Sequence, residues 1–224
     1  MKIWMIRHGE TPGNREKRYV GSTDEGLTEE EVNRLTEWRK KEKILLNENG
    51  RITETDFSGL LTGSAAIYRS PMKRCLDTYK EMTGDLAIRL PEPLVYENLR
   101  ECDFGDFEYK NYLELNGTKA YQRFLDTMGE SGFPHGETME EYKERTVAAF
   151  RTIVNMEMKK EEKNDLLLFF VHGGTIMAVM SSLSDEGRDY YDYQCKNLCG
   201  YLAEVAEGED ERILLTKLVK TELL

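Results

Sequence analysis

Four short polar segments of this chain contain the groups that phosphoryl transfer requires. Arg7 and His8 come directly after an apolar run at residues 3–6, and His172 comes directly after another at residues 166–171. Arg74 and Glu101 lie in segments between them. Because ligands of open α/β sheets collect at the carboxyl ends of the strands, two histidines that end neighbouring strands would face a single pocket.

These residue types can divide the steps of a phosphoryl transfer, which needs a nucleophile, cations around the phosphate oxygens and a proton donor for the leaving group. His8 can attack phosphorus when one ring nitrogen is unprotonated and the other is held by a hydrogen bond. Arg7 and Arg74 offer planar guanidinium groups to the phosphate, and His172 adds a further donor. Glu101 is the candidate general acid, and it would act as base when water attacks the phosphohistidine.

Each of these side chains taken alone has an ordinary structural explanation. A histidine that ends an apolar strand, such as His172, is commonly a hydrogen-bonded core residue, and a helical arginine, such as Arg74, commonly extends to solvent. The functional interpretation depends on their occurrence together where strands give way to loops or helices, where Gly173 also offers a helix-start amide. His135 lies in a loop before a helix, so we expect it to be an exposed surface residue.

Hydrophobic periodicity predicts one α/β domain over residues 1–224. We expect strands at residues 3–6, 65–68, 86–90, 166–171, 198–205 and 212–219. We expect helices after a capping box at Thr28–Glu31, from Ser70, over 109–128 with a break at Gly117, from a second capping box at Thr138 to about Lys160, and over 173–183. The Asn, Ser and Gly residues at 45–63 predict a loop or a small excursion from the domain, and the glycines at 129–136 predict a loop.

Composition excludes several classes of protein. The 224 residues include 42 acidic and 31 basic side chains, for a formal net charge of −11, which argues against nucleic acid as a general partner because phosphate-backbone binding needs a basic face. No apolar stretch approaches the roughly 20 residues that span a membrane, and the start of the chain does not resemble a signal peptide. The four cysteines lack disulfide-framework or zinc-site spacing, so we expect reduced thiols in a cytoplasmic protein.

The polar segments, in their order along the chain, resemble the motifs of the histidine phosphatase superfamily, also called the phosphoglycerate mutase-like family, from Lys2 to about Val219. The matching segments are Arg7-His8-Gly9-Glu10-Thr11 with Asn14, Ser70-Pro71 with Arg74 and Thr78, Leu99-Arg100-Glu101 with Phe104-Gly105, and His172-Gly173-Gly174. Each motif alone is weakly specific, but four in family order are strongly specific. The resemblance implies a three-layer α/β/α fold with a mixed, mainly parallel central sheet.

The resemblance also implies roles for individual residues. His8 would be the phosphorylated residue, Arg7, Arg74 and His172 would form the charged pocket around it, and Glu101 would donate the proton. Lesser contacts with the substrate are implied for Asn14, Gly21 and Gly173. Neither a metal nor a cofactor is implied.

Departures from the family pattern bear on the reaction. Phosphoglycerate mutases usually carry a Thr-Gly pair where this chain has Val20-Gly21, and they have a long insertion with paired arginines that is missing here. Hydrolysis of a small phosphorylated metabolite is therefore favoured over mutase activity. The segment 133–138 resembles the phosphatase branch, whose compact bacterial members include alpha-ribazole phosphatases and broad phosphomonoesterases. The alternatives are a mutase and a non-catalytic protein that senses a phosphorylated ligand; the sequence does not indicate an oligomeric state.

Overall fold

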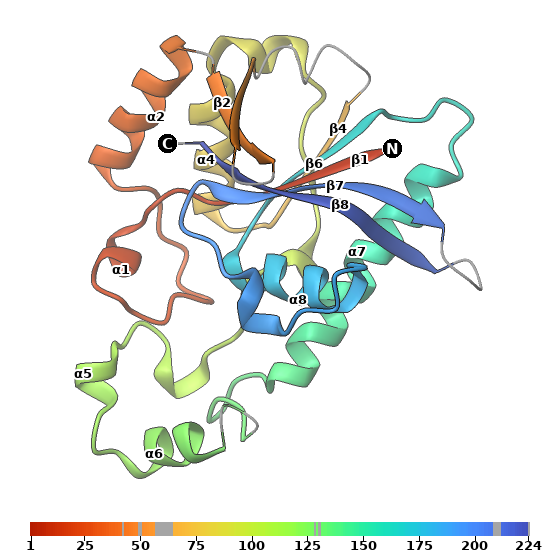
Figure 1. The fold of residues 1–224 in the computed structure, drawn as a ribbon. Helices are drawn as coiled ribbons and strands as arrows, with labels where there is room; N and C mark the ends of the chain where they lie inside the picture. Colours follow the sequence, from red (N-terminus) through yellow and green to blue (C-terminus); the bar gives the residue numbers. More distant parts are fainter. Residues whose placement is uncertain are drawn as a thin grey trace.

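A single mixed β-sheet forms the centre of the molecule (Figure 1). The computed structural model describes residues 1–41, 43–48, 51–56, 65–127, 129, 131–207 and 212–223. Eight strands of this part pair in the order β3-β2-β8-β7-β1-β6-β4-β5. Their bounds are Lys2–Arg7 (β1), Lys43–Glu48 (β2), Arg51–Asp56 (β3), Ala65–Arg69 (β4), Leu94–Val95 (β5), Leu166–Val171 (β6), Cys199–Glu207 (β7) and Ile213–Glu222 (β8).

Most of these strands run in one direction. Strands β1, β6, β4 and β5 pair in parallel, whereas β7, β8, β2 and β3 continue from β1 in successive antiparallel pairs. Alternation of direction means that β8 and β3 point the same way as β1, so only β7 and β2 are reversed among the described strands. Every residue of β6 is buried, as expected of an apolar strand covered on both faces. The predicted mixed, mainly parallel sheet is confirmed.

Helices cover both faces of the sheet and complete the three predicted layers (Figure 1). The longer ones are Glu29–Lys41 (α2), Lys73–Thr83 (α4), Met139–Met158 (α7) and Gly173–Leu183 (α8). Alternation along β1 explains the layering, because successive side chains of a strand point to opposite faces. Trp4 and Ile6 pack in one core cluster with residues of α2 and α4, whereas Ile3 and Met5 pack in another with residues of α7 and α8.

A smaller helical region lies beyond the sheet, between η2 (Glu97–Leu99) and the start of α7 (Figure 1). It comprises η3 (Gly105–Phe107), α5 (Tyr112–Leu115) and α6 (Lys119–Asp126), and the break between the two α-helices contains Gly117 as predicted. Its core cluster includes Phe107, Leu115 and Phe133 together with Tyr142 of α7. The remaining short helices are α1 (Pro12–Arg15), η1 (Gly84–Arg89) and η4 (Tyr190–Tyr193). None of the helices in the described ranges is long and apolar enough to cross a membrane.

Two predictions of secondary structure were wrong. Residues 45–63 were predicted as a loop or small excursion, but 45–48 belong to β2 and 51–56 form β3. These two strands are an antiparallel pair that extends the sheet edge by pairing with β8, and residues 49–50 and 57–63 lie outside the described residues. Residues 86–90 were predicted as a strand, but 84–89 form the 3₁₀ helix η1. The edge strand is instead β5, which begins only after Pro93, because prolines lack the amide hydrogen that a strand ladder needs.

Candidate active site

The parallel pairing of β1 and β6 brings the two predicted histidines together. His8 follows β1 and His172 follows β6, and the backbone amide of His8 donates to the Val171 carbonyl at 2.9 Å. The two imidazole centroids lie 5.2 Å apart with the ring planes at 67°. Both histidines are buried, His8 with 3 % and His172 with 0 % of its surface exposed. The sequence prediction that they share one site is therefore met by the geometry.

Hydrogen bonds assign a different ring proton to each histidine. His8 Nδ1 lies 2.8 Å from the Gly9 carbonyl oxygen, which can only accept, so Nδ1 carries the proton and Nε2 keeps its lone pair. His172 Nδ1 accepts from the Arg74 Nε–H group at 3.3 Å, so its proton is on Nε2, which donates to the Ser70 hydroxyl at 2.7 Å. His8 thus has an unprotonated nitrogen of the kind a nucleophile needs.

The surroundings keep both imidazoles uncharged. Burial lowers the pKa of His8 well below its usual value, and the guanidinium groups of Arg74 and Arg7 lower it further, against a hydrogen bond to Gly9 that raises it. Burial also lowers the pKa of His172, again with Arg74 as the next cause. Both rings are therefore neutral near pH 7, which leaves the His8 Nε2 lone pair available.

Two arginines flank the imidazoles. Arg74, on α4, is completely buried and donates to the carbonyl oxygens of Val20, Gly21 and Thr23 at 3.3, 3.0 and 2.9 Å. Arg7 donates through Nη1 to the Cys195 carbonyl at 2.7 Å, but its buried Nε has no hydrogen-bond partner in the described part of the chain. A buried donor without a partner is costly, so the Nε–H group of Arg7 is a candidate contact for an anion.

Gly173 lies beside Arg7 at the first residue of α8. A Cβ atom built on Gly173 would lie 3.4 Å from Arg7 Nε, so the helix amino terminus and the guanidinium converge. Amides at a helix amino terminus point outward and favour anions. His172 is the N-cap residue of the same helix. The four cationic or donor groups predicted for the phosphate are thus adjacent.

Asn14 and Gly21, the other predicted substrate contacts, both make hydrogen bonds to other residues of the protein. Asn14 Oδ1 accepts from Asn197 Nδ2 at 3.0 Å, and Asn197 also donates to the His8 carbonyl at 2.9 Å. The Gly21 amide donates to the Glu108 carboxylate at 3.0 Å, and its carbonyl accepts from Arg74. Contacts of Asn14 and Gly21 with a substrate stay predictions, and the sequence analysis did not identify Asn197 or Glu108.

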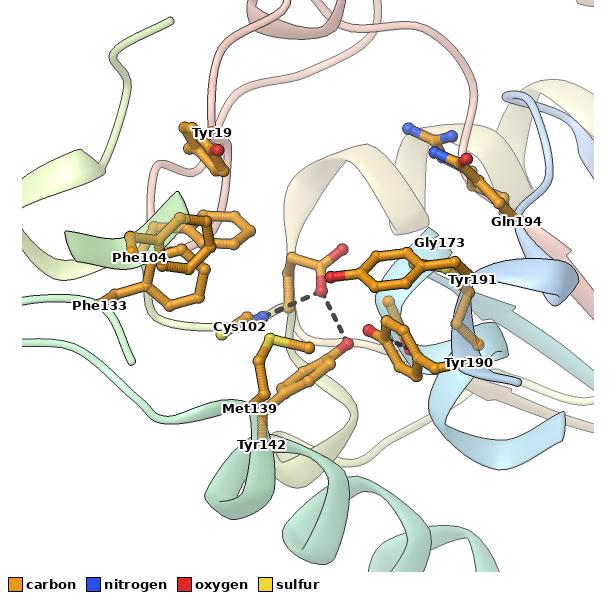
Figure 2. A pocket seen from close by; sticks show the side chains of 15 residues that line it. Tyr19, Cys102, Phe104, Phe133, Met139, Tyr142, Gly173, Tyr190, Tyr191 and Gln194 are labelled. Carbon is orange, nitrogen blue, oxygen red and sulfur yellow. Dashed lines mark hydrogen bonds between the residues drawn. The ribbon is translucent and has the colours of Figure 1, made fainter. Parts of the chain in front are cut away.

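Glu101, the predicted general acid, lies beside the amino terminus of α8. Its Oε1 accepts from the Tyr142 hydroxyl at 2.7 Å and from the Cys102 amide at 3.0 Å, and both hydrogen bonds are drawn as dashed lines in Figure 2. Tyr142 is buried and also lies 3.3 Å from the Thr175 hydroxyl. One carboxylate oxygen is therefore held in place, and Tyr142 is a site residue that the sequence placed only on a core-facing helix.

Arg145, one helical turn after Tyr142 on α7, fixes the segment that carries Glu101. It donates to the carbonyl oxygens of Asn98, Arg100 and Glu101 at 3.1, 3.0 and 2.9 Å and forms an ion pair with Glu137. Nothing in the spacing of Arg145 distinguishes it from other helical arginines, so the sequence analysis did not find it.

A cavity of about 360 Å³ opens beside Glu101 (Figure 2). Arg7, Glu101 and Gly173 are among the residues that line it. Aromatic side chains dominate the rest, with Tyr19, Phe104 and Phe133 on one side and Tyr190 and Tyr191 on the other, as Figure 2 shows. The volume falls within the range of about 300–1,000 Å³ typical of small-molecule sites. No group of three or more His, Cys, Asp or Glu side chains in the described residues is arranged to hold a metal ion.

The family of the chain follows from comparison with known proteins. The model of the histidine phosphatase superfamily (branch 1) matches residues 3–216, so the chain belongs to this superfamily. It is 25 % identical over 205 residues to an uncharacterized phosphatase of Bacillus subtilis, covering 92 % of this chain and 89 % of that protein. It is also 32 % identical over 115 residues to a protein of Schizosaccharomyces pombe named as a probable phosphatase, but this match spans only 51 % of the chain and 46 % of the relative.

Solved structures share the fold at lower identity. The alpha-ribazole phosphatase from Shigella flexneri superposes with a TM-score of 0.72 at 18 % identity, covering 96 % of this chain and 94 % of that one. An identity this low demonstrates the shared fold only.

Proposed function

We propose that the protein is a metal-independent phosphomonoester hydrolase that acts on a small phosphorylated metabolite through a phosphohistidine at His8. The observation that carries the proposal is the placement of the His8 ring. Its Nδ1 lies 2.8 Å from the Gly9 carbonyl oxygen, which leaves the lone pair on Nε2, and its centroid lies 5.2 Å from that of His172. Burial lowers the pKa of this ring, and the positive charges of Arg74 and Arg7 act on the same ring and lower its pKa further. Membership in the histidine phosphatase superfamily and the phosphatase names of two relatives support it.

The reaction has two balanced steps. In the first, His8 Nε2 attacks phosphorus, the bond from phosphorus to the ester oxygen breaks, and protonated Glu101 gives its proton to the departing alkoxide, which leaves as an alcohol. In the second, water attacks the phosphohistidine and gives a proton to the Glu101 carboxylate, the phosphorus–nitrogen bond breaks, and inorganic phosphate leaves. Arg7 and Arg74 stabilise the charge on the phosphoryl oxygens throughout.

The natural substrate is a finer proposal. Alpha-ribazole phosphate is the first metabolite to test, because the structural relative from Shigella flexneri is described as an alpha-ribazole phosphatase. Phosphoglycerate with a bisphosphoglycerate primer tests the mutase alternative, in which the phosphoryl group returns to substrate instead of water. Formation of an isomerised phosphoglycerate, without release of inorganic phosphate, would favour that alternative.

The decisive experiment compares wild-type protein with His8→Ala in hydrolysis of p-nitrophenyl phosphate, each with and without EDTA. We expect turnover by the wild type that EDTA leaves unchanged, and a loss of about a thousandfold or more in the variant. His135→Asn is the matched control, because His135 is exposed and its backbone lies in the left-handed region, which asparagine tolerates.

A chemical trap distinguishes the nucleophile from a ligand-binding residue. Rapid acid-free quenching of the wild type with radiolabelled ester is expected to leave label on His8, and none on His8→Ala. Turnover that survives in His8→Ala would overturn the assignment, and tight binding of phosphate esters without turnover would favour the non-catalytic sensor.

A further inference from the structure

We infer that the cavity beside Glu101 is a binding site for an aromatic leaving group without negative charge, which inserts between two walls of aromatic side chains. This inference rests on the proposed function, because it assigns the cavity to the alcohol portion of the ester. It narrows the substrate class from phosphomonoesters in general to those of flat aromatic alcohols that carry no negative charge.

The first wall is a rigid cluster of rings from three separate segments. Tyr19 and Phe104 lie edge to face with centroids 5.2 Å apart, and Phe104 and Phe133 lie edge to face at 4.9 Å. Phe107, which is buried, supports Tyr19 and Phe133 from behind at 6.0 and 5.8 Å. Rings held by one another in this way lose little freedom when a ligand arrives, so the wall is preorganised.

The second wall comes from η4, on the opposite side of the cavity (Figure 2). Tyr190 and Tyr191 lie edge to face at 5.0 Å and 88°. The Lys143 ammonium group sits 4.4 Å from the Tyr190 ring centroid, and the Tyr190 hydroxyl lies 3.5 Å from the Gly174 carbonyl, which together fix the ring. Tyr191 is 63 % exposed and lines the cavity, so it presents a large apolar surface that a ligand would cover.

The floor between the walls is apolar and adaptable. Met139 of α7 and Met177 of α8 both line the cavity, and thioether side chains make favourable contacts with aromatic rings. Seven of the fifteen described residues that line the cavity are aromatic. A flat ring in the cavity would therefore meet mainly aromatic rings and methionine sulfur.

Charge selects against negatively charged leaving groups. Of the fifteen described lining residues, Arg7 is the one cation, and it is assigned to the phosphate. A carboxylate on the leaving group would lose water against the negative faces of the aromatic rings without a further cation among the lining residues to bind it. The cavity thus favours an aromatic alcohol that carries no negative charge.

The test compares esters whose leaving groups have similar reactivity. Naphthylmethyl phosphate and propyl phosphate both release primary alcohols, so differences in kcat/KM report binding of the alcohol portion rather than its acidity. We expect naphthylmethyl phosphate to be preferred by at least about tenfold, and a carboxylate on the naphthyl ring to lower kcat/KM by about tenfold or more.

Variants separate the aromatic walls from general hydrophobicity. Tyr191→Ala is expected to lower kcat/KM for naphthylmethyl phosphate by about five- to tenfold and to lower kcat/KM for propyl phosphate far less, because a three-carbon chain offers little surface for the Tyr191 ring to cover. Tyr112→Ala is the matched control, because Tyr112 is 53 % exposed on α5 and is not among the residues that line the cavity. It should change neither substrate. Equal effects of Tyr191→Ala on both esters, or wild-type values that do not differ between them, would overturn the inference.

A binding measurement keeps the two proposals distinct. Naphthylethyl and propyl phosphonates cannot be hydrolysed, so their dissociation constants for the wild type and Tyr191→Ala can be measured by calorimetry whether or not any ester turns over. Tighter binding of the naphthyl compound that depends on Tyr191 would support the aromatic site even if hydrolysis failed. Hydrolysis of all esters with equal phosphonate affinities would reject the aromatic site and leave the phosphatase proposal intact.

Discussion

At the scale of single residues, His8 and His172 are both neutral but carry their ring protons on opposite nitrogens. The Gly9 carbonyl fixes the proton of His8 on Nδ1, whereas Arg74 and Ser70 fix that of His172 on Nε2. Nitrogen NMR of the ligand-free protein near pH 6.5 should therefore show two neutral rings of opposite tautomer, assigned with His8→Ala and His172→Ala. A cationic ring at either position, or the same tautomer at both, would contradict this geometry.

Tyr142 is a positioning residue for Glu101. Burial raises the pKa of Tyr142 well above its usual value, as does the nearby Glu101 carboxylate, so the phenol keeps its proton and donates it to Glu101 Oε1. Tyr142→Phe should lower kcat for alkyl phosphates by about tenfold, against about a hundredfold or more for Glu101→Gln. Both losses should shrink for aryl esters, which need little protonation to leave. If Tyr142 had only a structural role, Tyr142→Phe would reduce activity toward alkyl and aryl esters equally. The pH–rate profile of the variant would then match that of the wild type.

The sequence predicted the residues at strand ends but not the partners that orient them. Two histidines that follow apolar runs can be placed at one edge of a parallel sheet, because the carboxyl ends of parallel strands converge there. Tyr142 lies 41 residues beyond Glu101, and Asn197 lies 189 residues beyond His8. Their contacts depend on the path of intervening loops, for which periodicity carries no information. Glu31 illustrates the limit, because its carboxylate binds the Glu10 amide instead of completing the predicted box with Thr28.

At the scale of elements, helix α7 is the support on which the segment carrying Glu101 rests. Burial raises the pKa of Glu137, but the hydrogen bonds from Arg145 and from the Asp103 amide outweigh burial and hold this pKa below its usual value. Glu137 and Arg145 therefore form an ionised pair, which links the start of α7 to residues 98–103. Arg145→Met removes the cation and leaves backbone acceptors unpaired, which should lower the free energy of unfolding by about 2–3 kcal/mol.

The measurement is urea unfolding of Arg145→Met beside Arg151→Met, an exposed position on the same helix that should change stability by less than about 0.5 kcal/mol. Arg145→Met should also displace Glu101 and so lower kcat for alkyl phosphates, whereas Arg151→Met should not. Equal stability and activity of the two variants would show that α7 does not hold the Glu101 segment.

Central elements were easier to predict from the sequence than those at the sheet edges. Strand β6 is an unambiguous apolar run, and helix α7 begins with a complete capping box at Thr138; the structure confirms both elements. The hairpin of β2 and β3 was missed because its Asn and Gly residues were read as loop markers. The Asn49-Gly50 dipeptide between two six-residue strands is a common hairpin signal and could have identified it. Strand β5 has only two residues, too few for any pattern.

At the scale of the whole molecule, burying two histidines without charge makes stability depend on pH. The folded protein lowers the pKa of His8 and of His172 well below 6.5, through burial first and the arginines second, whereas the unfolded chain restores ordinary values. Below about pH 6.5 the unfolded state therefore binds more protons than the folded state, and stability must fall as the pH decreases. The loss continues until the folded histidines themselves become protonated.

The expected slope approaches about 2.7 kcal/mol per pH unit when both histidines of the unfolded chain are protonated, since each contributes about 1.36. Urea unfolding between about pH 6.5 and pH 5 measures this slope, because ordinary carboxylates titrate mainly below this range. His8→Asn and His172→Asn should each reduce the slope by about half, whatever they do to stability itself. A wild-type stability that stayed constant across this interval would mean that the two imidazoles are not held neutral, and the nucleophilic form of His8 would lose its structural basis.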